Sequence, residues 1–165
     1  MKKYSKGMFG GKFIPFHKGH IFCLDRAAQE CETVYLLLFI NSDAELEILK
    51  NSNEKYLHAD SRIEIISDIA AKYYPNVVFK IIDCIDIKLP DGTDDWDGET
   101  PLVYEACKGE PDAVYSSEYS YVEYFNRAYP HADCILVDCE RVNVPISATM
   151  IRAMKEWEER MKWLV

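Results

Sequence analysis

The chain has 165 residues, of which 48% are hydrophobic and 28% are charged, a globular composition that excludes disordered, collagen-like and coiled-coil classes. The formal net charge of −9 opposes binding to phosphate backbones, so we expect no nucleic-acid partner. No apolar run approaches the roughly 18 residues of a membrane helix, and the basic N-terminus lacks an apolar signal core. We therefore expect a single domain over residues 1–165 that has no membrane partner and is cytoplasmic.

Strand and helix patterns alternate along the first half of the chain. They predict a strand over Gly7–Phe13, a helix over Lys18–Glu30, a buried strand over Thr33–Ile40, a helix from Asp60 or Ser61 to Tyr73 and a strand over Val77–Ile82. Arg62 starts the second of these helices, where we expect it to be exposed in the first turn; an arginine that reaches the ligand site is the alternative.

The same alternation continues in the second half. It predicts a loop over Pro90–Gly98, a short helix to about Lys108, a strand over Asp112–Ser116, a helix over Ser120–Tyr129, a strand over Ala132–Asp138 and a closing helix from Ser147 to about Trp163. Helices between strands imply right-handed crossovers and parallel pairing. We predict an α/β fold, a Rossmann-like open parallel five-stranded sheet with helices on both faces and a ligand site at the carboxyl ends of its strands.

Residues 10–20 form a cationic segment in this acidic chain, with the sequence Gly-Gly-Lys-Phe-Ile-Pro-Phe-His-Lys-Gly-His. Glycines let a backbone approach phosphate closely, and the helix that follows is expected to present unpaired N–H groups to an anion. His17 and His20 are three residues apart, so a helical turn brings them to the same side, where they can donate to phosphate oxygens. We expect Gly19 to leave room for the ligand. Metal ligands or plain surface histidines are the alternatives.

A second cationic segment runs from Arg141 to Arg152. Ser147 is a natural N-cap and Thr149 lies in the first turn of the helix, while Arg152 carries two donors that can grip phosphate oxygens. A capped helix with a solvated arginine is the alternative. Two such segments in one chain favour a nucleotide site.

The two segments resemble the signatures of a known superfamily. Residues 11–20 resemble the HxGH signature of the nucleotidyltransferases, and Ile146–Arg152 resembles their second signature, Ile-Ser-x-Thr-x-x-Arg, in the same order and at a similar separation. Within this superfamily the chain is most similar to the NadR-type nicotinamide mononucleotide adenylyltransferase module. Further similarity lies at Lys12-Phe13, Asp94–Asp97, Ser116–Glu118, Val137-Asp138 and Arg141.

The resemblance implies transfer of AMP from ATP to a pyridine mononucleotide, which forms NAD and pyrophosphate. It implies three catalytic side chains, with His17 and His20 on the triphosphate and Arg152 on the leaving pyrophosphate. The implied ATP-binding residues are Gly11, Phe13, Ser147, Thr149 and Arg141, with Gly11 and Phe13 acting through backbone groups. Magnesium would bridge the ATP phosphates, with few protein ligands of its own.

Trp96 lies in an acidic segment, Asp83–Glu99, and is the candidate acceptor-binding residue. An indole could stack on a cationic pyridinium ring, although a tryptophan that anchors a long loop would look the same. Trp157 and Trp163 fit core packing or a subunit contact, which leaves a homo-oligomer open. The six cysteines lack zinc or redox spacing, so we expect buried, reduced thiols.

Two other functions remain open from the sequence. One is a cytidylyltransferase that uses CTP and a phosphorylated alcohol, although members of that branch usually carry Gly-Ile-Ser-Thr-Thr in place of a signature that ends in Arg152. The other is a module that senses nucleotides without turnover, which the presence of His17, His20 and Arg152 disfavours. The sequence does not identify the acceptor.

Overall fold

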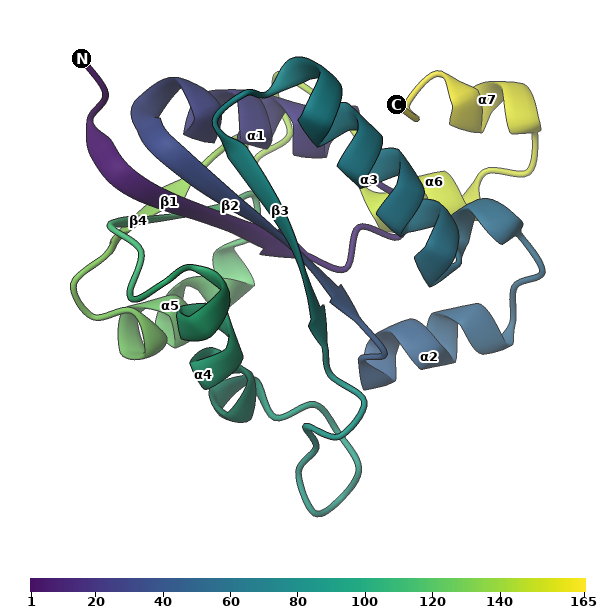
Figure 1. The fold of residues 1–165 in the computed structure, drawn as a ribbon. Helices are drawn as coiled ribbons and strands as arrows, with labels where there is room; N and C mark the ends of the chain where they lie inside the picture. The colour runs from purple at the N-terminus through teal and green to yellow at the C-terminus, as the bar shows by residue number, and fades with distance from the viewer.

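Five parallel strands form one sheet in the computed structural model, which describes residues 1–165 (Figure 1). The strands are β1 (Tyr4–Gly11), β2 (Cys31–Ile40), β3 (Val77–Asp83), β4 (Ala113–Ser116) and β5 (Asp133–Leu136). Their order is β3-β2-β1-β4-β5, and every neighbouring pair is parallel. The winding therefore reverses between β1 and β4, which creates a crevice at their carboxyl ends. The predicted Rossmann-like sheet is confirmed.

Helices cover both faces of the sheet, as predicted. Helices α1 (Lys18–Glu30) and α3 (Ala59–Tyr73) lie on one face, and α4 (Trp96–Ala106) and α5 (Val122–Ala128) lie on the other (Figure 1). Each layer has its own core: Leu24 and Ile66 belong to the first, and Val103 and Tyr129 belong to the second. No helix is both long and apolar enough to cross a bilayer. All six cysteines are free thiols, four buried and two partly buried.

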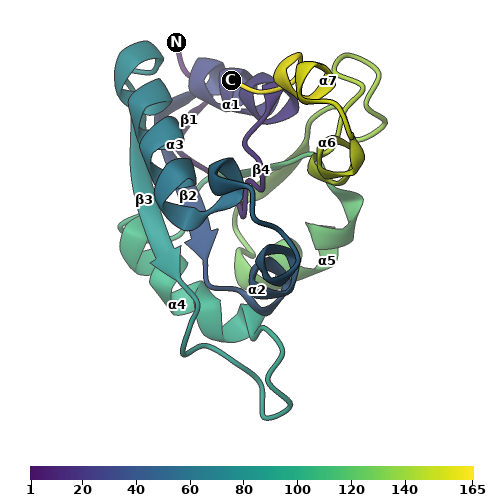
Figure 2. The same cartoon turned by 90° about the vertical axis from the view of Figure 1, so that its right-hand side faces the viewer.

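Helix α2 (Asp43–Lys50) is absent from the sequence-based assignment. It follows the carboxyl end of β2 (Figure 2), and the Ser42 hydroxyl caps it by accepting a hydrogen bond from the Glu45 N–H at 3.1 Å. Its one buried residue is Glu45, whereas Leu46 is largely exposed. The helix therefore lacks the apolar stripe from which a sequence pattern is recognised. Two short 3₁₀ segments, η1 (Lys55–Leu57) and η2 (Tyr119–Tyr121), complete the connections.

The single closing helix predicted over Ser147–Trp163 is wrong. The segment forms two helices, α6 (Ala148–Ala153) and α7 (Trp157–Met161), separated by extended backbone at Met154. Arg160 accounts for the break, because it donates to the Met154 carbonyl at 2.7 Å and pairs with Glu54 beside η1. Trp157 packs edge-on against Tyr56 but remains 47% exposed, so the structure does not place it in the core.

The expected exposure of Arg62 is also wrong, since only 1% of the residue is accessible. Its guanidinium donates to the carbonyls of Leu57 at 2.8 Å and Lys12 at 2.6 Å and pairs with the buried Glu45. One side chain thus joins α3, η1 and α2 to the segment that follows β1. The second carboxyl oxygen of Glu45 is buried without a hydrogen-bond partner.

We expect Arg62→Met to lower the free energy of unfolding by about 3–5 kcal/mol, because it leaves the Glu45 carboxylate buried and unpaired. Urea unfolding followed by circular dichroism measures the change. Arg26→Met is the matched control: Arg26 pairs with Glu30 on α1, but half of its side chain is exposed. That variant should lose less than about 1 kcal/mol. Equal small losses of unfolding free energy in the two variants would show that the buried Arg62–Glu45 pair stabilises the fold no more than an exposed pair does.

Candidate active site

The segment between β1 and α1 begins with a tight turn. The sequence pattern predicts that the first strand extends to Phe13, but β1 ends at Gly11 and Phe13 adopts a positive φ of 51°. The Phe13 ring is buried and lies against Gly11, where a Cβ would come within 2.8 Å of it. Phe16 packs edge-on against Phe13 and stacks on His20 at a centroid distance of 5.4 Å. Aromatic packing therefore fixes the turn and orients the His20 imidazole.

His17 and His20 form a reciprocal cap at the start of α1. The Nδ1 atom of His17 accepts from the Gly19 N–H at 3.0 Å, and the His17 N–H donates to Nδ1 of His20 at 3.2 Å. The ring centroids are 3.7 Å apart, which confirms that the imidazoles share one side. Because both Nδ1 atoms accept, the proton of each neutral ring lies on Nε2. The pair thus carries two Nε2–H donors that the cap does not use.

The first-turn backbone N–H groups of α1 are not available to an anion, contrary to the expectation from the sequence. The Lys18 N–H donates to the Trp163 carbonyl at 2.9 Å, and the His20 and Ile21 N–H groups donate to the His17 carbonyl. Together with the Gly19 bond to His17, these contacts satisfy the first-turn amides within the chain. An anion at this helix must therefore be met by side-chain donors, because the backbone donors are already paired.

Gly19 also has a different role from the one expected. A Cβ at this position would lie 2.8 Å from Cε1 of the His17 ring, closer than real Cβ contacts allow. The glycine therefore makes room for the capping imidazole and not directly for a ligand. The sequence showed that a small residue was needed, but not which neighbour required it.

Burial keeps both histidines neutral. His17 is only 3% exposed, and burial, assisted by the Arg141 cation, lowers its pKa to about 4. Burial also lowers the pKa of His20 well below its ordinary value, and His17 and Arg141 act in the same direction. At neutral pH the imidazoles are therefore uncharged donors, and the positive charge of the site comes from arginines.

The second signature contacts the first. Ser147 caps α6 by accepting from the Met150 N–H at 3.2 Å, as predicted. Arg152 reaches back to the first segment and donates to the Ile14 carbonyl at 2.5 Å, and it donates to the Thr149 hydroxyl at 3.3 Å. Arg152 is therefore a fixed bridge between the two signatures, in contrast to the solvated side chain that was the alternative interpretation.

Arg141 lies near the histidine pair at the other end of the second segment. It donates to the Ile146 carbonyl at 3.2 Å and pairs with Glu118 at 2.5 Å. The carboxylate of Asp138 accepts hydrogen bonds from three consecutive backbone N–H groups, residues 142–144, and so shapes the loop that carries Arg141. Asp138 belongs to the residues that resemble the family, and its contacts place it in a structural role.

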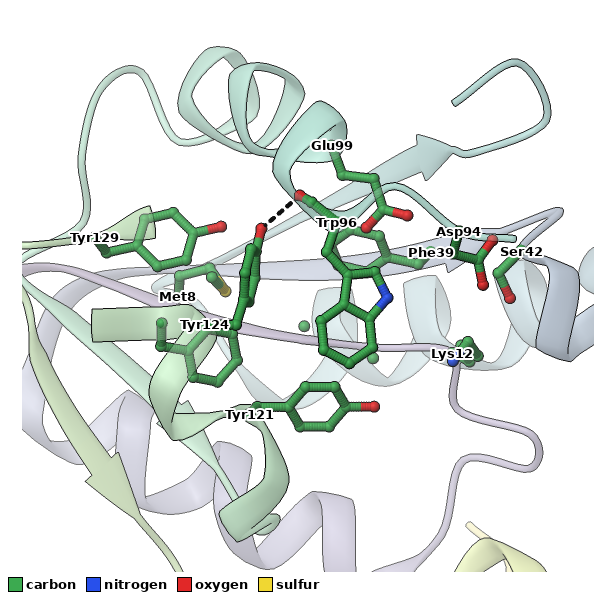
Figure 3. A pocket seen from close by; sticks show the side chains of 13 residues that line it. Met8, Lys12, Phe39, Ser42, Asp94, Trp96, Glu99, Tyr121, Tyr124 and Tyr129 are labelled. Atoms are coloured by element: carbon green, nitrogen blue, oxygen red, sulfur yellow. Dashed lines mark hydrogen bonds between the residues drawn. The ribbon is translucent and has the colours of Figure 1, made fainter. Parts of the chain in front are cut away.

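An aromatic cavity opens on the other side of the residue 10–12 backbone (Figure 3). Trp96 is not in a loop: it is the first residue of α4, which Asp95 caps by accepting from the Gly98 N–H at 3.0 Å. Its indole lies 5.3 Å from the Tyr121 ring and 5.6 Å from the Tyr124 ring, and the Tyr124 hydroxyl donates to the Trp96 carbonyl at 2.8 Å. Trp96 is thus next to the first signature, as the sheet topology predicted.

Sequence patterns alone do not identify most residues of this cavity. The complete lining is Met8, Gly10, Gly11, Lys12, Phe39, Ser42, Asp94, Trp96, Glu99, Tyr121, Tyr124, Phe125 and Tyr129. A cluster of aromatic residues at 119–129 was visible, but core packing explains such a cluster equally well. Only the crossover from β4 to α5 shows that Tyr121 and Tyr124 face Trp96 and not the core alone.

Comparison with known proteins agrees with this geometry. The cytidylyltransferase-like family matches residues 8–154, which include both signatures. The chain belongs to this family. It is 25% identical, over 95% of its length, to the trifunctional NAD biosynthesis/regulator protein NadR of Escherichia coli K12. It is 24% identical, over 96% of its length, to the phosphopantetheine adenylyltransferase of Streptococcus uberis. The predicted nucleotidyltransferase membership is confirmed.

A solved structure of NadR in complex with NR shows the same fold, with a TM-score of 0.66 and 19% identity over 99% of this chain. The chain spans 39% of the Escherichia coli NadR sequence and 44% of the solved NadR chain, but 86% of the phosphopantetheine enzyme. The similarity to NadR therefore concerns one module of a longer protein. The family establishes a nucleotidyltransferase and leaves the acceptor to be determined.

The buried histidine pair has a consequence for stability. The folded chain holds His17 neutral with a pKa near 4, whereas the unfolded chain regains the ordinary value of 6.5. Protonation then favours the unfolded chain, so the stability present above pH 6.5 is lost as the pH falls from 6.5 towards 4. We expect this group to contribute a loss of up to about 3 kcal/mol over that window, with His20 adding a loss of the same sign.

Urea unfolding at a series of pH values across this window measures the loss. His17→Gln should show a shallower fall than the unmodified chain. His58→Gln is the control, because His58 is exposed and its side chain makes no cap bond to α3. Parallel pH profiles for the unmodified chain and His17→Gln would contradict the assignment.

Proposed function

We propose that the chain transfers AMP from ATP to nicotinamide mononucleotide, forming NAD and pyrophosphate. The observation that carries the proposal is the aromatic cavity around Trp96, which shares the residue 10–12 backbone with the phosphate-binding signature. A nucleotide held at the histidine pair and a planar acceptor held at Trp96 would have their phosphates meet in the crevice at the carboxyl ends of β1 and β4. The similarity to NadR supports the same acceptor class.

The phosphate side of the site consists of neutral donors and two cations. We assign the triphosphate contacts to the Nε2–H groups of His17 and His20, and the stabilisation of the leaving pyrophosphate to Arg152. Further ATP contacts are assigned to Ser147, Thr149, Arg141 and backbone groups of Gly11 and Phe13. The bond from Arg152 to Ile14 supports this assignment, because it brings the two signatures to one side of the crevice.

Charge determines the mechanism. An oxygen of the acceptor phosphate attacks the α-phosphorus of ATP in line, and the bond from that phosphorus to the bridging oxygen breaks as pyrophosphate leaves. The nucleophile is already ionised, so the site needs no general base. Positioning and donors aimed at the developing negative charge supply the rate enhancement. The neutral imidazoles serve this purpose, because they donate hydrogen bonds without taking a proton from the acceptor.

Magnesium enters this scheme as part of the Mg–ATP substrate. The structure contains no group of three or more His, Cys, Asp or Glu side chains placed to hold a metal ion. We therefore propose that phosphate oxygens and water supply most of its ligands, as Mg²⁺ commonly prefers. We assign further contacts with the phosphate oxygens to the arginines and imidazoles of the two signatures.

The acceptor side of the site suits a cationic aromatic ring. Trp96, Tyr121 and Tyr124 offer ring faces to the cavity, and a pyridinium ring is attracted by such faces. The carboxylates of Asp94 and Glu99 add negative charge to the same lining. A flexible, uncharged pantetheine arm would use neither feature, which favours the pyridine mononucleotide over phosphopantetheine.

Pyrophosphate release tests the proposal over a matrix of ATP and CTP against nicotinamide mononucleotide, phosphopantetheine and glycerol phosphate. We expect turnover chiefly with ATP and nicotinamide mononucleotide. His20→Ala should lower that turnover by about a hundredfold or more, since one charge-stabilising donor is worth that much. Circular dichroism checks that the variant is folded. Preferred turnover of CTP would indicate a cytidylyltransferase, and nucleotide binding without turnover would indicate a sensing module.

Trp96→Ala should raise the KM for the mononucleotide about tenfold, because a stacked cationic ring gains about 1–2 kcal/mol. The KM for ATP should barely change. Trp157→Ala is the control, since Trp157 packs against Tyr56 on α7, away from the cavity. Equal rises in both constants would make Trp96 part of a general structural lid. If neither KM changes, Trp96 only anchors its segment and the acceptor binds elsewhere.

A further inference from the structure

Glu99 presents a buried carboxyl group to the aromatic cavity. The residue lies on α4 and is 8% exposed, and its side chain lies beside Trp96 in the cavity lining (Figure 3). Its backbone N–H donates to the Asp95 carbonyl within the helix. The protein group that donates to its carboxyl is the Cys84 thiol, which is a weak hydrogen-bond donor. An ionised carboxylate can accept about four hydrogen bonds, so a buried carboxyl that has one weak donor and faces a cavity points to a ligand that completes it.

The other carboxylates of this acidic segment already have partners. Asp94 pairs with Lys88 at 2.7 Å and accepts from the Asp43 N–H at 2.8 Å. Asp95 caps α4. Asp97 is exposed and pairs with Arg127 outside the cavity. Glu99 is therefore the cavity carboxyl that remains available to a bound molecule.

The surroundings of Glu99 favour a positively charged partner. Burial raises its pKa, and the neighbouring Asp94 acts in the same direction, whereas Cys84, Lys12 and Lys88 oppose the rise. A cationic ring in the cavity would also lower the pKa of Glu99 and would so hold the group as a carboxylate. An anionic ring substituent would instead bring two like charges together in a poorly hydrated space.

We propose that Glu99 is a specificity-determining residue that selects a carboxamide-bearing, cationic pyridine ring over the same ring with a carboxylate. This inference rests on the proposed function and adds the basis of acceptor choice. The Glu99 carboxylate accepts a hydrogen bond from the amide NH₂ of nicotinamide and faces its ring charge. Nicotinate has no N–H at that position and offers a second negative charge, so it is rejected both by a lost bond and by repulsion.

The test compares kcat/KM for nicotinamide and nicotinate mononucleotides at saturating ATP. The unmodified chain should favour the amide by about tenfold or more, because a hydrogen bond to a charged group is worth that much. Glu99→Gln keeps the shape of the side chain and removes its charge, so it should reduce the ratio about tenfold while the KM for ATP stays unchanged. Asp97→Asn removes the same charge from the same helix outside the cavity and should leave the ratio as it was.

The outcomes separate this inference from the function on which it rests. If the unmodified chain uses neither mononucleotide, the proposed function fails. If it uses nicotinamide mononucleotide but shows no preference over nicotinate, or if Glu99→Gln and Asp97→Asn change the ratio equally, the inference about Glu99 fails and the function stands. A nicotinate preference that Glu99→Gln abolishes would also overturn it, because Glu99 would then act as a protonated donor. Binding of each mononucleotide to the unmodified chain, measured by calorimetry, tests the preference without any variant.

Discussion

Two arginine side chains hold the irregular segment between β1 and α1 by its carbonyl groups, and the candidate site depends on them. Arg62 donates to Lys12 from α3, and Arg152 donates to Ile14 from α6. Neither a helix nor a strand stabilises these residues, so tertiary hydrogen bonds to charged donors must do so. The cap formed by His17 and His20 starts only a few residues further on. Displacing either arginine would therefore move the histidine donors relative to the second signature.

The site has two halves of opposite polarity on either side of the residue 10–12 backbone. One half carries imidazole donors and arginines, and the other is lined by aromatic rings with Glu99 among them. The reversal of strand order at β1 makes this division possible, because helices from both faces of the sheet reach the same crevice. A polyanion and a cationic ring can then be held close together without competing for the same groups.

Local patterns predicted the sheet, the principal helices and both signatures, because each of these is encoded within a short stretch of sequence. The failures share a different cause. Helix α2 buries Glu45 and not an apolar stripe, and Arg62 is buried because that glutamate reaches it from another element. The break in the closing helix depends on Arg160 meeting Glu54, more than a hundred residues away. Pairings between distant charged residues leave no periodic trace in a sequence, so only the folded chain reveals them.

The first-turn amides of α1 are occupied by the His17 cap and by the Trp163 carbonyl, so an anion at this helix would have to be met by side chains, the two imidazoles among them. Amides keep the same charge at every pH, whereas imidazoles can gain a proton when a negative group approaches. A triphosphate at this site would reverse part of the depression that burial imposes on the two histidines. Under the proposed assignment of the triphosphate contacts, nucleotide binding and proton uptake would be thermodynamically linked. The affinity for the nucleotide would then rise as the solution becomes more acidic, until the fold itself is weakened.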